Sequence, residues 1–320
     1  MPAITTGVTS LDVLKINNSE EIVGAIMDCI KRHPEMEYFQ ASPVSRNAYE
    51  TLIVTDLPKV GFRKPGEFAE HFSPELKTAM VKCAHFDASW SMDHALATQS
   101  DWGKEKAYAL QTITHLNAAF YSLCRQIWYG TNNVLANSEG FPGLFQLIGS
   151  TAPNASNAEL HVDAGGTGNK LSSVFAVSTG IDAIQLAWGS EGQLTEGQIQ
   201  VTPFQKTGTD GKLTHAHYAS QQIEGWVGLQ VTSAFAFGRI KNLSVAKPLN
   251  DDQLFELISR FPVGREPSAF FMSRRSLEQL RKSRQAFNVT GAPAPTPTEV
   301  AGVPIYVSDA ISNEEEKLTV

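Results

Sequence analysis

Cysteine and charge are both scarce in this 320-residue chain. The three cysteines, Cys29, Cys83 and Cys124, form no Cys-x-x-Cys pair and no Cys/His ligand set, so we interpret them as reduced core residues. Charged residues make up 18% of the chain, with 26 Lys and Arg against 33 Asp and Glu. The net charge of -7 provides no basic face that would grip a polyphosphate.

Long hydrophobic runs are also missing. No window approaches the roughly 18 uninterrupted apolar residues of a membrane-spanning helix. The first residues, Met1 to Thr6, lack the basic region and apolar run of a secretory signal. We therefore expect a protein that is made in a cytosol and has no membrane partner.

Apolar residues, in contrast, are plentiful. A chain of this length buries about three quarters of the surface that its unfolded form exposes, so one large domain or two interleaved domains can be stable without a disulfide or metal. With 42% hydrophobic residues against 18% charged, apolar surface remains for contacts between subunits.

The first third of the sequence predicts a helix and a long hairpin. Ser19 can cap a helix whose apolar residues keep helical spacing until Pro34. Extended patterns run from Tyr49 to Arg63 and from Met80 to Met92, on either side of a charged turn at Lys64 to Glu67. Because an isolated hairpin is marginal in water, this one should rest on a neighbour.

The strongest helix is predicted from Ser100 to Trp128, with Gly130 as its stop. At ~1.5 Å per residue it would span roughly 40 Å and act as a spine. Six apolar residues recur at spacings of three and four and should share its buried face: Ala109, Ile113, Leu116, Phe120, Leu123 and Ile127.

Sheet patterns dominate the rest of the chain. Strands are predicted at 174–177, 183–188, 198–204, 226–240, 269–272 and 300–307, helices at 251–261 and 273–286, and a proline-rich loop at 292–297. In the longest strand the small residues of one face would let another element approach closely, and the core face would hold Val227, Leu229, Val231, Phe235 and Phe237. Glu314 to Glu316 are predicted to form a solvated tail.

One motif suggests a ligand, the glycine loop from Asp163 to Lys170. Its glycines and lysine would suit a phosphate, but a phosphate loop needs Gly-Lys-Ser/Thr at the start of a helix. Here Gly168-Asn169-Lys170 precedes a strand. We therefore predict a structural turn whose glycines take positive φ, and we retain a nucleotide-binding enzyme that uses this loop as an alternative function.

The remaining titratable residues provide no catalytic set. Three histidine arrangements lack either a nucleophile or a third metal ligand and are interpreted as structural or exposed: His85 with Asp87, His94 with Asp93, and His215 with His217. No catalytic, cofactor-binding or metal-binding residue is assigned, and no enzyme is predicted. One helix face is basic and is interpreted as solvated or as salt-bridging between subunits: Arg274, Arg275, Arg281, Lys282 and Arg284.

Several motifs occur in a fixed order along the chain. Leu57 to Glu67 forms the hairpin tip, and Ser89-Trp90-Ser91-Met92-Asp93 follows it. Three further motifs come next: Trp128-Tyr129-Gly130 at the helix end, Phe141-Pro142-Gly143-Leu144, and Asp163 to Gly168 before Ser172-Ser173. Gly302-Val303-Pro304-Ile305 lies near the end. From about Asn47 to the last strand, this order resembles the major capsid proteins of short-tailed bacteriophages.

The resemblance implies the Hong Kong ninety-seven type fold, an α+β fold with an arm, an extended loop, a spine helix and an axial domain. Residues 1–46 would form the N-terminal arm, 47–92 the extended hairpin loop, and 93–135 a peripheral domain with the spine helix. Residues 136–320 would form the axial domain, interleaved with strands of the peripheral domain.

The resemblance also implies a function without a cofactor. The protein would self-assemble into pentamers and hexamers of an icosahedral virion shell that encloses double-stranded DNA, which it would contact non-specifically. Scaffolding, portal and decoration proteins are candidate further partners, and another ring-forming virion component is a second alternative. Our hypothesis for the subunit interface is the hairpin tip: Leu57, Val60, Phe62, Arg63, Lys64 and Glu67.

Overall fold

The computed structural model describes residues 32–56, 66, 75–132, 135–148, 160–192, 194–207, 213–286 and 294–318. The predicted helix from Ser19, Cys29 and nearly all of the hairpin tip lie outside these residues. No helix in the described ranges is both long enough and apolar enough to cross a membrane.

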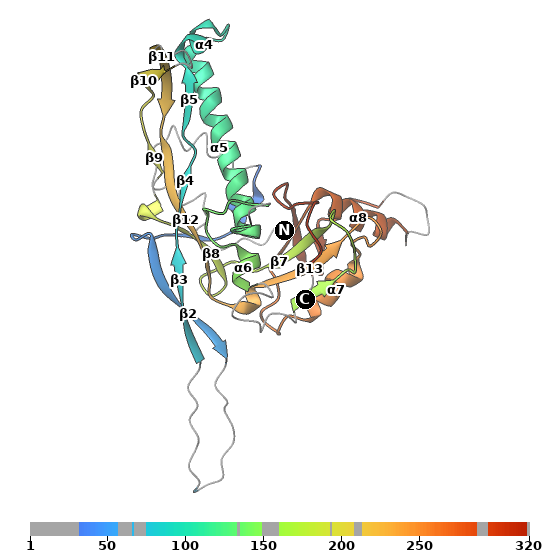
Figure 1. Cartoon of the computed structure of the whole chain (residues 1–320). Coiled ribbons are helices and arrows are strands. Elements are labelled where there is room, and N and C mark those ends of the chain that lie inside the picture. Colours follow the sequence, from blue (N-terminus) through green and yellow to red (C-terminus); the bar gives the residue numbers. More distant parts are fainter. Residues whose placement is uncertain are drawn as a thin grey trace.

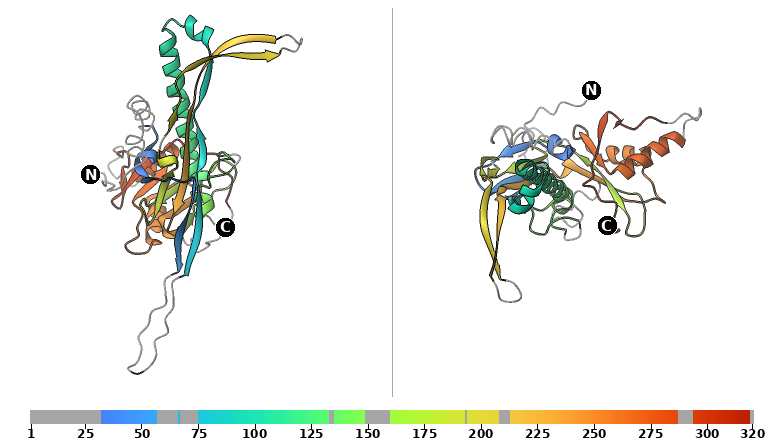
Figure 2. Two further views of the ribbon diagram at one scale, coloured as in Figure 1. Left: turned by 90° about the vertical axis from the view of Figure 1, so that its left-hand side faces the viewer. Right: turned by 90° about the horizontal axis from the view of Figure 1, so that it is seen from above.

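The molecule is elongated (Figure 1). Helix α5 (Lys104–Tyr129) runs along it, and a compact lobe with α7 (Asp251–Ser259) and α8 (Arg274–Ala286) lies beside the C-terminal half of α5. A hairpin of β2 (Ala48–Asp56) and β3 (Glu75–Lys82) projects at the same end of the molecule. At the other end, the hairpin of β10 (Gln200–Thr207) and β11 (Leu213–Gln221) leaves the body sideways (Figure 2).

The spine helix is confirmed, but it begins later than predicted. A separate short helix, α4 (His94–Gln99), precedes it, and Gly103 (φ 83°) forms the corner between them. Gly130 ends α5 with φ 63°, and an added Cβ there would lie 2.2 Å from the backbone nitrogen of Gly143. Four of the six predicted face residues are buried, whereas Ala109 and Ile113 are exposed because the buried stripe passes through Ala107 and Tyr108 instead.

The strands form four sheets. The three larger ones have the orders β1-β8-β12-β4 with β9 on β12, β10-β11-β5, and β15-β16-β14-β7-β13-β6, and β2 pairs with β3. Their further strands are β1 (Ala41–Pro43), β4 (Ala84–Asp87), β5 (Trp90–Asp93), β6 (His161–Asp163), β7 (Ser172–Val177), β8 (Ile184–Trp188), β9 (Thr195–Glu196), β12 (Ile223–Val231), β13 (Phe237–Leu243), β14 (Ala269–Met272), β15 (Glu299–Val300) and β16 (Val303–Val307). Two short helices, α3 (Pro34–Tyr38) and α6 (Leu144–Ile148), pack near the end of α5.

The six-stranded sheet of the lobe is buried on both faces. Along β7, Val174 and Ala176 pack with leucines of α7 and α8, whereas Phe175 and Val177 face the core around Trp128 of α5. The Trp128 and Phe175 rings stack with centroids 4.7 Å apart. Successive strand residues therefore serve two cores, as the alternation of a strand requires.

Three sequence predictions are corrected. The predicted strand 226–240 is two strands, β12 and β13, in different sheets; the turn at Ala234–Ala236 between them is capped by the Ser233 hydroxyl, which accepts from the Phe235 nitrogen. An alternating pattern continues through such a sheet change, so it could not reveal the break. The predicted returning strand Met80 to Met92 is likewise divided among β3, β4 and β5.

The third correction concerns the C-terminal tail. Glu315 is buried and its backbone pairs with Leu171, so it is not solvated. A run of three glutamates predicts exposure from composition alone, and the buried arginine that pairs with Glu315 lies far away in sequence.

Candidate subunit interface

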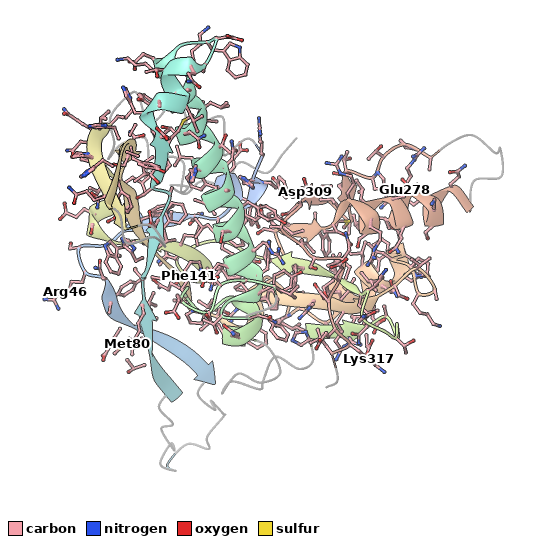
Figure 3. All side chains as sticks on the ribbon, turned by 45° about the horizontal axis from the view of Figure 1, so that its top comes forward. Arg46, Met80, Phe141, Glu278, Asp309 and Lys317 are labelled. Atoms are coloured by element: carbon pink, nitrogen blue, oxygen red, sulfur yellow. The ribbon has the colours of Figure 1, made fainter. Side chains whose placement is uncertain are left out.

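The hairpin of β2 and β3 carries apolar surface that its own chain does not cover. The two strands pair from Ala48 with Lys82 to Asp56 with Glu75, and no third strand joins them in the described part of the chain. Leu52 is 60% exposed and Met80 59% exposed. Figure 3 places Met80 on the hairpin, away from the lobe that holds Glu278. A two-stranded ribbon with exposed large apolar side chains is typical of a surface that binds a partner.

The base of this hairpin is firmly attached to the body. The Tyr49 hydroxyl donates to Gln230 Oε1 at 2.5 Å, and the Gln185 amide donates to the same oxygen at 2.8 Å. Gly228 lets the hairpin approach β12, since an added Cβ would lie 3.0 Å from the Lys82 carbonyl oxygen. The predicted close approach at a small residue is thus confirmed, and the contacts of the described hairpin residues with the body lie at its base.

The opposite end of the molecule exposes a second set of apolar side chains. Trp102, at the corner between α4 and α5, is 67% exposed, and Leu96 of α4 is 59% exposed. On β10, Phe204 is 60% exposed and its ring meets Tyr218 edge-on at 5.9 Å. Both ends of the elongated chain therefore present candidate contact surfaces.

The six hairpin residues predicted for the interface lie outside the described residues: Leu57, Val60, Phe62, Arg63, Lys64 and Glu67. Their role stays a prediction. The described strands on either side of them, β2 and β3, form the exposed ribbon.

The glycine loop is a structural turn, as predicted. Gly165 and Gly168 have φ of 76° and 105°. Asp163 accepts hydrogen bonds from the Gly165 nitrogen at 2.8 Å and from the Asn242 amide at 2.9 Å. The Gly166 nitrogen donates to the Asn242 carbonyl oxygen at 3.0 Å. Two of the amides that would cradle a phosphate are thus occupied within the chain, and the loop leads into strand β7.

The three histidine arrangements are not acid-base pairs. His85 pairs with Glu224 at 3.2 Å while Asp87 accepts from the Ser89 nitrogen. His94 contacts the Tyr108 hydroxyl at 2.7 Å, and Asp93 caps α4. His215 and His217 are exposed on β11, as predicted. The described residues contain no group of three or more His, Cys, Asp or Glu side chains that could hold a metal ion.

Three residues of the predicted basic helix face, Arg284, Lys282 and Arg275, are paired within their own chain. Arg284 makes two hydrogen bonds to Asp251, at 2.8 and 2.7 Å, and Lys282 lies 3.4 Å from Glu278. Arg275 donates to the carbonyl oxygens of Asn313 and Lys170. These contacts tie α8 to its surroundings within one subunit.

A buried ion pair joins the spine helix, the lobe and the C-terminal segment. Arg239 of β13 and Glu315 are each 3% exposed and lie 2.9 Å apart. Tyr129 and Ser173 both donate to Glu315 at 2.6 Å. Burial, followed by the charge of Glu315, holds the pKa of Tyr129 well above its usual range. Tyr129 therefore stays protonated and serves as a permanent donor.

A second buried carboxyl, Glu35 of α3, lies at the same junction. Its Oε1 accepts from the Trp128 indole at 2.9 Å and from the Ser308 hydroxyl. Burial raises the pKa of Glu35, and burial followed by Glu35 raises that of the Cys124 thiol. Cys83 and Cys124 are both free and buried, which confirms the prediction for these two cysteines.

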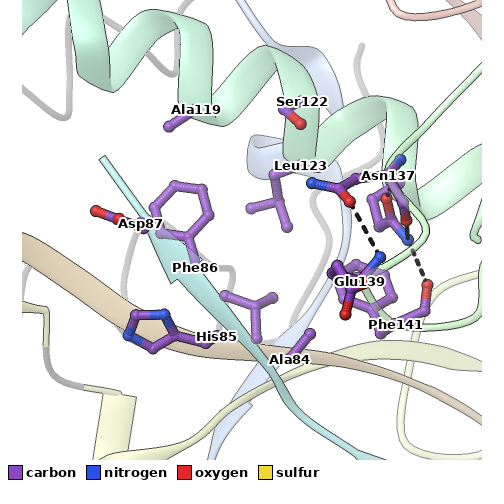
Figure 4. Close-up of a pocket in the computed structure, with 13 residues that line it drawn as sticks. Ala84, His85, Phe86, Asp87, Ala119, Ser122, Leu123, Asn137, Glu139 and Phe141 are labelled. Carbon is purple, nitrogen blue, oxygen red and sulfur yellow. Dashed lines mark hydrogen bonds between the residues drawn. The ribbon is translucent and has the colours of Figure 1, made fainter. Parts of the chain in front are cut away.

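A cavity of about 190 Å³ opens between β4 and α5 (Figure 4). Phe86, Leu123 and Phe141 provide its apolar wall. The Gln126 amide donates to the Asn137 and Phe141 carbonyl oxygens at 3.1 and 2.7 Å and so fixes the loop that closes one side. Ser122 and His85 both line it, and the His85 ring is hydrogen-bonded to Glu224 rather than to Ser122.

Sequence reasoning missed the residues at these surfaces and joints. Trp102 carries a usable signal, because a tryptophan between aspartate and glycine at a helix start has little room to be buried. The sequence contains no signal that Glu35 and Glu315 are buried, since their partners are distant in sequence.

Comparisons with known proteins agree with this geometry. The family Major capsid protein GP7 matches residues 34–319. The chain is similar in structure to a protein of bacteriophage Epsilon15, with a TM-score of 0.59 and 16% identity over 88% of both chains. Against the decorated capsid of bacteriophage JBD30 the TM-score is 0.47, with 10% identity over 88% of this chain and 91% of that one. No curated protein sequence matches.

The likeness to the Epsilon15 protein shows the fold, which is of the Hong Kong ninety-seven type. The match to the family spans nearly the whole described chain. Nothing in these comparisons supports the nucleotide-binding alternative. The chain belongs to the Major capsid protein GP7 family, and it is a structural protein of a capsid shell.

Proposed function

We propose that this protein forms the pentamers and hexamers of an icosahedral virion shell around double-stranded DNA, and that its β2–β3 hairpin lies on a neighbouring subunit. The hairpin carries this proposal, because Leu52 and Met80 are exposed on a ribbon whose described residues contact their own subunit at the base. A neighbour that covers this ribbon would bury the exposed apolar area. Repeated weak contacts of this kind sum to a stable closed shell.

The charge of the chain suits a container for DNA. With a net charge of -7, the subunit as a whole repels phosphate, so packaged DNA would not adhere strongly to the wall during filling. In this scheme the subunit is made in the host cytoplasm and joins scaffolding, portal and decoration proteins there.

Shortening the hairpin tests the proposal. In the variant, residues 57–74 are replaced by Asn-Gly, which favours a two-residue hairpin turn. We expect a folded subunit with an unchanged unfolding midpoint and no closed shells in electron micrographs, whereas the full chain forms shells. Normal shells from the shortened chain would contradict the role of the hairpin, and uniform rings from the full chain would favour another virion component.

A further inference from the structure

Most of the partly buried arginines in the described residues are engaged by acceptors of their own chain. Arg239 pairs with Glu315, Arg284 with Asp251, and Arg281 donates to the Ala294 carbonyl oxygen at 3.2 Å. Arg125 of α5 differs. Its Nε is buried and has no acceptor, and no carboxylate of the described residues lies within ion-pair distance. A guanidinium in this state has donors to spare for a partner.

Arg125 borders an open cavity of about 480 Å³ on the side of the spine helix. Tyr121 and Ser122 line it from the helix, and Asn137 and Ser138 line it from the facing loop. The guanidinium carbon lies 5.9 Å from the centroid of the Tyr121 ring, a cation–π distance that orients the side chain. Hydroxyl and amide groups therefore surround one oriented cation.

The facing loop is fixed before any partner arrives. Gln126 is buried, and its Oε1 accepts from the Asn137 nitrogen at 3.1 Å while its Nε2 donates to the Asn137 carbonyl oxygen at 3.1 Å. Figure 4 draws the hydrogen bond to the Phe141 carbonyl oxygen, which also holds this loop. Binding at such a preformed site costs little ordering of the loop.

The residues that line this cavity favour a carboxylate as its ligand. Arg125 is the one cation among the residues that line the cavity, and a guanidinium fits a single carboxylate in a two-bond geometry. A nucleic-acid backbone would be held by several cations in a row. The chain itself has 33 acidic residues against 26 basic ones, so a second copy can supply the carboxylate.

We propose that the cavity beside Arg125 receives one carboxylate from the β2–β3 hairpin of a second copy of this chain. This inference rests on the proposed function, in which the hairpin lies on a neighbour. The sequence of the hairpin offers five acidic residues for this contact: Glu50, Asp56, Glu67, Glu70 and Glu75. Arg125 would then fix where the hairpin lies, while the apolar residues of the ribbon supply buried area.

Charge reversal tests this contact. In Arg125→Glu we expect the yield of sedimenting shells to fall at least tenfold, roughly the cost of separating one desolvated charge pair. Arg265→Glu makes the same change at an exposed arginine between α7 and β14 and should leave the yield unchanged. If Arg125→Glu does not fold, Arg125→Gln replaces it, with a smaller loss in the same direction. One of five second substitutions, each changing a hairpin acid to lysine, should restore assembly of Arg125→Glu.

The outcomes separate the two proposals. If the unaltered chain forms no shells, the proposed function fails. If the unaltered chain forms shells and both Arg125 variants match it, the inference about Arg125 is overturned. Loss of shells that none of the five lysine substitutions restores would overturn the hairpin as the source of the carboxylate. Normal shells that retain less DNA would assign Arg125 to a phosphate instead.

Discussion

The β2–β3 hairpin and the six-stranded sheet of the lobe are built from similar strands but are stabilised in opposite ways. In the lobe, β7 is buried along its whole length between α5 on one face and α7 and α8 on the other. In the hairpin, Leu52 and Met80 are more than half exposed, and the described residues that contact the body lie at the base. The lobe packs both faces of β7 within its own chain, whereas our proposal has the hairpin completed by a partner. On this proposal, a shell subunit separates folding from assembly within one chain.

The largest effect on stability should come from the lobe core. Trp128 is fully buried, stacks on Phe175 and donates to Glu35, so Trp128→Ala should lower the free energy of unfolding by about 3–5 kcal/mol. Urea denaturation followed by circular dichroism measures this loss. A loss below about 1 kcal/mol would break the comparison, because the lobe would then not depend on its core.

The buried ion pair should come next. Glu315→Ala leaves the Arg239 charge uncompensated in the interior and should cost about 3–5 kcal/mol. A double variant that replaces Arg239 with Met and Glu315 with Leu should lose less than the single change, because neither charge remains. The urea midpoints of both variants measure these losses. If Glu315→Ala leaves the midpoint unchanged, the C-terminal segment does not stabilise the contact between the lobe and the spine helix.

The glycine loop offers a smaller and sharper contrast. An added Cβ at Gly166 would lie 2.2 Å from the Asn242 carbonyl oxygen, so Gly166→Ala should cost about 1–3 kcal/mol. At Gly165 nothing lies within 4 Å, and only the positive φ of 76° opposes alanine, at about 1–2 kcal/mol. Thermal melts of the two variants test the structural role of the loop. Binding of ATP that is lost in Lys170→Ala would instead revive the ligand interpretation.

Glu35 should make the stability depend on pH. Because burial raises its pKa in the folded state above the ordinary value of 4.5, its favourable contribution is complete below that value and is lost as pH rises through the folded pKa. The side chain introduced by Glu35→Gln carries no charge at any pH. Relative to this variant, the unaltered chain should therefore become less stable as the pH rises above the ordinary value of 4.5 in urea titrations. A constant difference as the pH rises would show that Glu35 is not buried in the folded protein.

The sequence predicted the local elements well and the long-range joints poorly. The spine helix, its Gly130 stop and the positive φ of the glycine loop follow from apolar spacing and from glycine chemistry, which are local. The break between β12 and β13 and the burial of Glu315 depend on residues far away in sequence, so no window of the chain encodes them.

For the candidate interface, too, local features could be predicted from the sequence and long-range contacts could not. An exposed hairpin could be predicted from its extended pattern and charged turn, and a close approach from the small residues that include Gly228, whereas the hydrogen bond from Tyr49 to Gln230 could not. Arg125 was missed because a single arginine on a helix is ordinary in sequence. Only the cavity beside it, formed by a loop that Gln126 fixes, distinguishes it.

One measurement tests the separation of folding from assembly most directly: shell yield and unfolding free energy for the double variant Leu52→Ser/Met80→Ser. We predict that the free energy of unfolding stays within about 0.5 kcal/mol of the unaltered chain, as is usual for exposed positions, while the yield of shells falls at least tenfold. Val263→Ser/Val245→Ser, which removes apolar side chains that are 98% and 81% exposed elsewhere, serves as the control and should change neither quantity. Full assembly of the hairpin variant would contradict the account.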